Sequence, residues 1–151
     1  MDKFVFDTTW IVKGLVKPRR RKDDEELQHQ LRLHNKAKEY LQKVEENEIR
    51  MIIPSLALIE TASVVSRLTN DSSLSRDAVS FLWENAEKIF FDFETLDTSI
   101  EMGIKTKSSG FDTLYLALLK LTGAALLTDD SKLHDLAKSN GYESKLLREM
   151  L

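Results

Sequence analysis

The segment Phe4-Val5-Phe6-Asp7, near the start of the chain, decides the fold. Its short apolar run is typical of a buried strand, and the run ends at an aspartate. The next residues, Thr9 to Val16, repeat apolar side chains at the spacing of a helix. The chain therefore opens as a strand, a turn and a helix, with a carboxylate at the end of the strand.

The same alternation continues along the rest of the chain. Short apolar or aromatic-rich runs predict further strands at 51–53, 89–93 and 124–127. Helical periodicity and capping residues predict helices over 24–46, 55–69, 75–89, 98–107, 113–121 and 130–140. Gly141 stands where a left-handed helix cap is expected. The tail 142–151 is compatible with a short strand and a turn of helix, and the pattern leaves it open.

The order of these elements indicates the fold class. Sequential parallel strands need helical crossovers, so repeated strand–helix units predict a mainly parallel sheet. We expect a three-layer α/β/α sandwich with a central sheet of four to five strands. A length of 151 residues suits one domain spanning 1–151, and no internal repeat or low-complexity linker divides it.

Composition limits the possible functions. The formal net charge is -3, so no global positive field attracts nucleic acid, and any such contact must be local. The absence of cysteine excludes disulfides, thiolate zinc sites and a cysteine nucleophile. The apolar run at the N-terminus is far shorter than a signal peptide core or a membrane span. We therefore expect a soluble cytoplasmic protein with no membrane association.

Acidic residues follow two of the predicted strands. Asp7 comes directly after the first strand, and Asp129 and Asp130 follow the strand at 124–127 with only Thr128 between. In open α/β sheets, ligands bind beyond the carboxyl ends of the strands, at the point where strand order reverses. If these two strands are neighbours at that point, their carboxylates converge.

Two further acids occupy apolar surroundings. Glu60 lies four residues after Leu56 and four before Val64, so it shares a helix row with apolar residues. A buried carboxylate is costly without a cation or hydrogen-bond donors. Asp112 opens the most hydrophobic helix of the chain. Together with the acids at the strand ends, these residues favour a shared divalent cation, which relieves their repulsion.

Structural explanations compete with this one. Asp112 and Asp130 are equally acceptable as helix N-caps, and Asp7 as a turn residue. Glu60 has no comparable local role, because an acid on an apolar row stabilises nothing nearby.

The histidines and the known catalytic motifs offer no better chemistry. His29 and His34 are five residues apart on a charged helix, so we expect surface roles, and we expect a structural role for His134. The chain has no HExxH motif, Gly-rich phosphate loop or nucleophile elbow, which argues against zinc proteases, nucleotide kinases and serine hydrolases. A haloacid-dehalogenase-type phosphatase normally has a second acid two positions after the first, where this chain has Thr9.

Four segments, taken in order and with their spacing, carry a resemblance that covers essentially the whole chain. They are Phe4-Val5-Phe6-Asp7-Thr8-Thr9; Pro54-Ser55 with Glu60 in the ensuing helix; Phe111-Asp112-Thr113-Leu114-Tyr115-Leu116-Ala117; and Leu127-Thr128-Asp129-Asp130 followed by Leu133, Ala137 and Gly141. With these segments the chain resembles PIN domains, including the VapC-like toxin nucleases of bacterial and archaeal toxin–antitoxin pairs.

The resemblance implies a function. The acidic quartet of the family would be Asp7, Glu60, Asp112 and Asp130, with Thr9 and Thr128 as supporting hydroxyls. The adjacent Asp129 could also reach a metal, although the usual spacing selects Asp130. The implied activity is endonucleolytic hydrolysis of RNA with Mg²⁺ or Mn²⁺. In the expected arrangement Asp7 and Asp112 contact the metal directly, and Glu60 and Asp130 act through metal-bound waters or a second metal.

The resemblance also implies partners, namely a second copy in a homodimer and a small antitoxin protein. The amphipathic helices at 24–46 and 75–89 could furnish such surfaces, although ordinary packing on the sheet is the favoured interpretation. The basic run Lys17 to Lys22 could contact phosphates, but the acids that follow it favour a solvated loop. The competing function is a PIN-like module that holds RNA or a protein without turnover.

Overall fold

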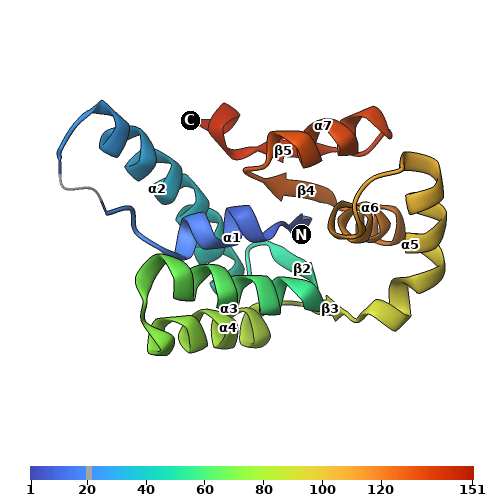
Figure 1. The fold of residues 1–151 in the computed structure, drawn as a ribbon, viewed down its shortest axis with the longest axis horizontal. Coiled ribbons are helices and arrows are strands. Elements are labelled where there is room, and N and C mark those ends of the chain that lie inside the picture. Colours follow the sequence, from blue (N-terminus) through green and yellow to red (C-terminus); the bar gives the residue numbers. More distant parts are fainter. Residues whose placement is uncertain (20–21) are drawn as a thin grey trace.

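A computed structural model describes residues 1–19 and 22–151 of the chain (Figure 1). The basic run Lys17 to Lys22 therefore lies partly outside the described residues. The elements follow in the order β1 (Lys3–Phe6), α1 (Thr8–Leu15), α2 (Glu25–Glu45), β2 (Arg50–Pro54), α3 (Ser55–Thr69), α4 (Ser72–Asn85), β3 (Lys88–Phe90), α5 (Asp92–Thr106), α6 (Gly110–Thr122), β4 (Ala125–Thr128), α7 (Ser131–Ser139), β5 (Ser144–Leu146) and the 3-10 helix η1 (Leu147–Met150).

The strands form one parallel sheet of five strands in the order β3-β2-β1-β4-β5. The first strand lies at its centre, where Val5 pairs with Ile52 of β2 on one side and with Leu126 of β4 on the other. The predicted α/β class and mainly parallel sheet are confirmed. The tail 142–151 supplies the fifth strand and η1.

Alternating side chains divide the sheet into two buried faces. Phe4 and Phe6 of β1 pack in one core with Trp10 of α1, Leu41 of α2 and Ala57 of α3. The intervening Val5 packs on the other face in a second core, which residues of α5, α6 and α7 complete. Because successive side chains of a strand point to opposite faces, a strand with apolar residues throughout is buried on both sides. The chain is therefore the expected three-layer sandwich.

Helices α1 and α2 approach each other closely at Gly14. A Cβ at Gly14 would lie 2.7 Å from Leu41 Cδ1 and 3.0 Å from the backbone carbon of Ala37. The contact also buries His34, whose Nδ1 lies 2.8 Å from the carbonyl oxygen of Lys13 near the end of α1. The expected surface role of His34 is therefore wrong, because the close approach of α1 covers that face of α2.

Several other boundaries differ from the sequence prediction. The helix expected over 75–89 runs as α4 from Ser72 to Asn85, and the one expected over 113–121 starts at Gly110. The third strand stops at Phe90, rather than 93, because its partner β2 ends at Pro54, which pairs with Phe90. Helix α5 then starts at Asp92, not at Thr98. Its start is stabilised by Glu94, whose carboxylate accepts a hydrogen bond from the Phe91 N–H at 2.8 Å.

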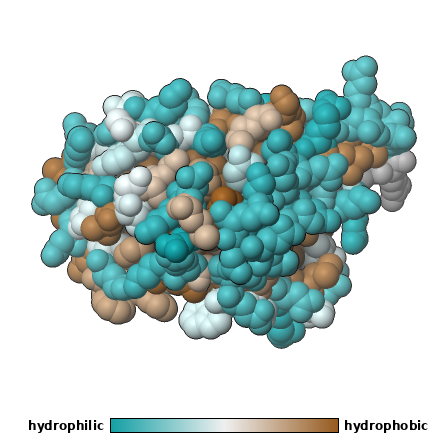
Figure 2. Space-filling model, turned by 180° about the vertical axis from the view of Figure 1, so that it is seen from behind, coloured by the Kyte–Doolittle hydropathy of each residue, from teal (hydrophilic) through white to brown (hydrophobic). Residues whose placement is uncertain are grey.

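The surface carries one marked apolar stripe. Four residues of α5 at helical spacing are exposed by half or more, namely Phe93, Leu96, Ile100 and Ile104. Figure 2 shows the molecule from behind, where most residues are hydrophilic and apolar residues form small separate patches between them. Across residues 1–19 and 22–151, no helix combines the length and the apolar character that crossing a membrane requires.

We predict that Gly14→Ala destabilises the protein by about 1–3 kcal/mol, because the new methyl group overpacks the contact between α1 and α2. Urea denaturation monitored by circular dichroism measures this change. The matched control is Gly110→Ala, since no atom lies within 4 Å of a Cβ at Gly110. Equal stability of the two variants would contradict the packing argument.

Candidate active site

The site lies where the order of strands reverses. The chain runs outward from β1 to β2 and β3 on one side, and β4 and β5 lie on the other side. Asp7 follows β1, and its N–H donates a hydrogen bond to the carbonyl of Leu127 in β4 at 2.9 Å. Asp130 follows β4 at the same edge. The structure therefore brings the two strand-end acids together at the crevice where α/β sheets bind ligands.

Asp7 is a buried carboxylate with a side-chain exposure of only 5%. Its Oδ2 accepts hydrogen bonds from the hydroxyls of Thr9 at 2.6 Å and Thr128 at 2.7 Å. Each hydroxyl in turn accepts a backbone N–H at 2.9 Å, from Asp129 and from Asp130 respectively. The two threonines thus fix the Asp7 carboxylate and attach the loop after β4 to it.

Glu60 reaches the same region from α3. It is half-buried, and its Oε1 accepts a hydrogen bond of 3.4 Å from the Thr8 hydroxyl. The hydroxyl oxygen of buried Tyr115 on α6 lies 3.1 Å from that of Thr8 and accepts the Thr8 N–H at 3.3 Å. A chain of hydrogen bonds therefore links the start of α1 to α3 and α6.

Asp112 and Asp130 differ in their helical positions. Ser109, not Asp112, is the N-cap of α6, because its hydroxyl accepts the Asp112 N–H at 3.3 Å. The capping explanation of Asp112 is therefore wrong. Asp130 does cap α7, since its Oδ1 accepts the N–H groups of Lys132 at 2.9 Å and Leu133 at 3.2 Å.

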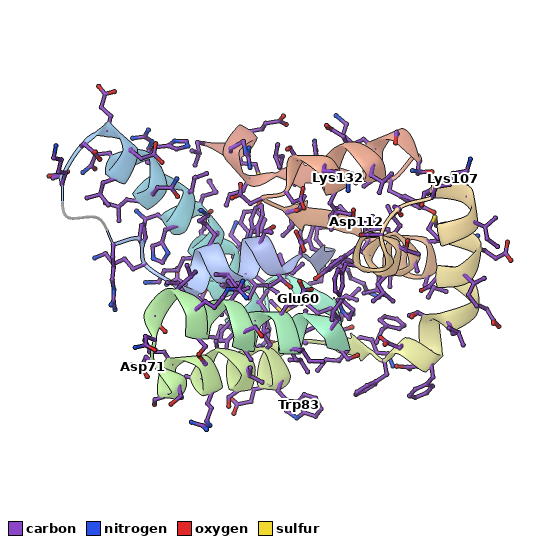
Figure 3. The ribbon with its side chains drawn as sticks, in the orientation of Figure 1. Glu60, Asp71, Trp83, Lys107, Asp112 and Lys132 are labelled. Atoms are coloured by element: carbon purple, nitrogen blue, oxygen red, sulfur yellow. The ribbon has the colours of Figure 1, made fainter. Side chains whose placement is uncertain are left out.

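All four acids line one cleft with a volume of about 870 Å³. In Figure 3, Glu60 on α3, Asp112 on α6 and Lys132 on α7 lie near one another in the middle of the molecule, whereas Asp71 lies at its periphery. Among the described residues, four cationic side chains also line the cleft, namely Lys13, Lys17, Arg19 and Lys132. Its wall includes Phe111, which is 57% exposed.

Burial and mutual repulsion govern the charges of the central acids. Burial raises the pKa of Asp7, and the neighbouring Asp130 charge adds to this effect, whereas Thr9 and Thr128 oppose it. The pKa of Glu60 is raised by burial first and then by the charges of Asp7 and Asp112. Burial also raises the pKa of Tyr115. These couplings connect the four acids in a chain from Asp130 through Asp7 and Glu60 to Asp112.

The cations near the cleft are unequally distributed. Asp129 has two of them, because Lys13 Nζ lies 3.8 Å from its Oδ2 and Arg148 of η1 lies 3.4 Å from its Oδ1. Lys132 Nζ lies 3.8 Å from Asp112 Oδ2. Among the ion pairs of the described residues, none involves Asp7 or Glu60. Among the described residues, the two most central acids therefore have uncharged donors as partners and no cation.

The donor set suits a hard divalent cation. Asp7 Oδ1, Glu60 Oε2 and Asp130 Oδ2 are oxygens without a hydrogen bond to the described residues, and carboxylate oxygens are preferred ligands of Mg²⁺. Among the same residues, no three acids or histidines are arranged closely enough to enclose an ion directly. The arrangement fits an ion that keeps several waters, as Mg²⁺ does.

Other groups of interest lie in or near this region. His134 is buried away from the cleft lining, with Nδ1 2.6 Å from Ser144 Oγ, as a structural role requires.

Sequence reasoning missed Thr8, Tyr115 and Lys132. Tyr115 was missed because it lies at a position where the helical pattern predicts an apolar core residue, and only its hydroxyl group indicates another role.

We predict that Asp7→Asn raises the melting temperature of the metal-free protein at neutral pH by about 2–4 °C, or about 1 kcal/mol, because it removes a buried charge. The folded-state pKa of Asp7 lies above its ordinary value of 3.8. The contribution of Asp7 to stability is therefore greatest below that value and is lost as the pH rises through the folded-state pKa. Thermal denaturation in chelator across this pH range measures both effects.

The comparison variant is Asp130→Ala, which we expect to lower stability by about 1 kcal/mol, because it removes the N-cap of α7. A decrease of the melting temperature in Asp7→Asn would show that the Asp7 charge stabilises the fold.

The fold is similar to that of solved structures. A chain of the crystal structure of VapBC2 from Rickettsia felis, bound to a DNA fragment from their promoter, has a TM-score of 0.65 at 15% sequence identity. The match covers 95% of this chain and 98% of that one. A domain of a functionally unknown protein from Methanocaldococcus jannaschii DSM 2661 has a TM-score of 0.50 at 18% identity, over 97% and 91% of the two chains.

At these identities the two structures establish the fold. No curated relative matches the sequence. The PIN domain family, however, matches residues 5–139, a span that contains the four acids and most of the sheet. The chain therefore belongs to the PIN domain family.

Proposed function

We propose that this protein is a metal-dependent endoribonuclease that hydrolyses RNA phosphodiester bonds at Asp7, Glu60, Asp112 and Asp130. PIN domains are generally nucleases. One observation carries the proposal, which is that four acids from separate elements line one cleft at the strand-order reversal. Burial raises the pKa of Asp7 and of Glu60, repulsion from the neighbouring acids adds to it, and a bound cation would relieve that repulsion.

The proposed metal is Mg²⁺ or Mn²⁺. Asp7 and Asp112 would hold it directly, and Glu60 and Asp130 would hold waters bound to it. When bound, such an ion acidifies a water and neutralises the charge that develops on the phosphate. Asp130 is favoured over Asp129 because Lys13 and Arg148 already neutralise Asp129.

The surrounding hydroxyls act by holding the acids in place. Thr9 and Thr128 bind one oxygen of Asp7 and leave the other oxygen available to a ligand. Thr8 holds Glu60 in the same way, and Tyr115 fixes Thr8. Such supporting hydrogen bonds orient metal ligands and increase affinity.

The proposed substrate is single-stranded RNA. Lys13, Lys17, Arg19 and Lys132 give the acidic cleft a basic rim, and cations of this kind contact phosphates. The exposed ring of Phe111 offers a surface on which an unpaired base can stack. A recessed site of this size admits a flexible strand more readily than a duplex.

We further infer two protein partners, a second copy of the chain and a small antitoxin that covers the cleft. The α5 stripe of Phe93, Leu96, Ile100 and Ile104 supports the first, because large apolar groups are exposed there. The sequence had favoured ordinary packing for the two amphipathic helices. Leu33, Ala37, Leu41 and Val44 of α2 are buried in this way. Inhibition of cleavage by the product of a neighbouring gene would support an antitoxin.

We predict that purified protein cleaves a mixed RNA pool when Mn²⁺ or Mg²⁺ is present and does not cleave it in chelator. Asp7→Asn should reduce the rate at least about a hundredfold, and Thr128→Val about tenfold to a hundredfold, because they remove a ligand and its support. Gel analysis of end-labelled RNA measures the rates.

Asp71→Asn is the matched control for this experiment. Asp71 also caps a helix, but it does not line the cleft, and asparagine preserves the cap. Metal binding by calorimetry without any cleavage would favour a non-catalytic binding module instead.

We predict that light scattering gives a mass of twice the 17.4 kDa chain, and that Ile100→Glu gives the mass of one chain. A charge in the α5 stripe would have to be desolvated in the interface. Trp83→Glu on α4 is the control, since Trp83 is 59% exposed outside the stripe. A monomeric wild type, or a dimer that persists in Ile100→Glu, would contradict this interface.

A further inference from the structure

Lys132 is the cation closest to the acidic quartet. Its Nζ lies 3.8 Å from Asp112 Oδ2, and no other cation among the described residues pairs with one of the four acids. Its backbone is fixed by Asp130, which accepts its N–H at 2.9 Å. The Lys132 side chain is 78% exposed, so it is free to change partners.

Stability of the fold does not explain this lysine. A positive charge in the first turn of a helix is unfavourably placed relative to the helix dipole. An exposed ion pair of this length contributes little to stability. Asp112 itself is 15% exposed, and the capping of α6 does not use its side chain, because Ser109 is the N-cap.

The other cations of the cleft are placed differently. Lys13 is associated with Asp129 and also donates a hydrogen bond to Gln30 at 3.0 Å. Lys17 and Arg19 lie on the segment after α1. Lys132 alone, among the cations that the structure describes on the cleft lining, approaches a quartet acid.

We propose that Lys132 exchanges partners during the reaction, from Asp112 in the free protein to a phosphate of the bound RNA. The proposal rests on the proposed nuclease function. In the free protein Lys132 partly neutralises Asp112 and competes with a divalent cation for it. A cation held by Asp112 would repel the Lys132 ammonium group, which would then be available to a phosphate of the RNA backbone. A lysine suits this role, because its ammonium group binds phosphate as a mobile point charge.

This exchange predicts opposite changes in two measurements on Lys132→Met. Calorimetric titration of the protein alone with Mn²⁺ should give an affinity about threefold to fivefold higher than wild type, because a competing cation is gone. Cleavage of single-stranded RNA at saturating Mn²⁺ should show kcat/KM lower by about tenfold, mainly through a higher KM, with a weaker dependence on salt. Lys132→Arg keeps the positive charge and should stay closer to wild type than Lys132→Met in both measurements.

Lys138→Met is the control, because Lys138 is exposed on the same helix but does not line the cleft. If Lys132 had a merely structural role, its replacement would not raise the Mn²⁺ affinity and lower RNA cleavage at the same time. Unchanged or weaker Mn²⁺ binding in Lys132→Met, or unchanged cleavage, would overturn the exchange while leaving the nuclease function intact. If the wild-type protein neither binds Mn²⁺ nor cleaves RNA, both the nuclease function and the exchange of partners by Lys132 are wrong.

Discussion

The burial of the Asp7 carboxylate between β1 and β4 is the constraint on which the site depends. A carboxylate removed from water and without a cation partner is costly, and burial accordingly raises its pKa. Two threonine hydroxyls compensate in part, and each also binds the loop after β4. The hydroxyls that stabilise the buried Asp7 carboxylate therefore also set the position of Asp130. Local stability is reduced at the point where chemistry is expected, as is common at functional sites.

The rest of the sandwich brings the other acids to this point. Glu60 belongs to α3, which contributes Ala57 to the core on one face of the sheet, whereas Asp112 belongs to α6, which covers the other face. The site thus lies at the edge where the two helical layers meet. Because strand side chains alternate between the faces, a register shift of one residue would reverse the burial of Phe4, Val5 and Phe6. The core packing of β1 and the position of Asp7 are therefore determined together.

Sequence reasoning was most reliable where one physical rule dominates. The central strands β1, β2 and β4 were predictable because residues on both of their faces are buried, so each appears as a short apolar run. Whether β1 and β4 are neighbours could not be deduced from periodicity, because strand order depends on the packing of the whole chain. The start of α5 was missed because the aromatic content of Phe91 and Phe93 suggested a strand, while the capping by Glu94 decided otherwise. Tyr115 and Thr8 are 107 positions apart, and the sequence around neither residue indicates that the two interact.

The adjacent residues Asp129 and Asp130 have different roles, because Asp129 pairs with cations whereas Asp130 caps a helix beside Asp7. Asp129 attracts Lys13 and Arg148, and Arg148 also donates a hydrogen bond of 2.5 Å to its carbonyl oxygen, which ties η1 to the loop. Asp130 uses one carboxylate oxygen to cap α7 and lies close enough to Asp7 to raise its pKa. By holding two cations, Asp129 keeps them from pairing with Asp7, Glu60 or Asp130. Lys13 and Arg148 can therefore lie beside the acidic cleft without neutralising its central acids, because both already pair with Asp129.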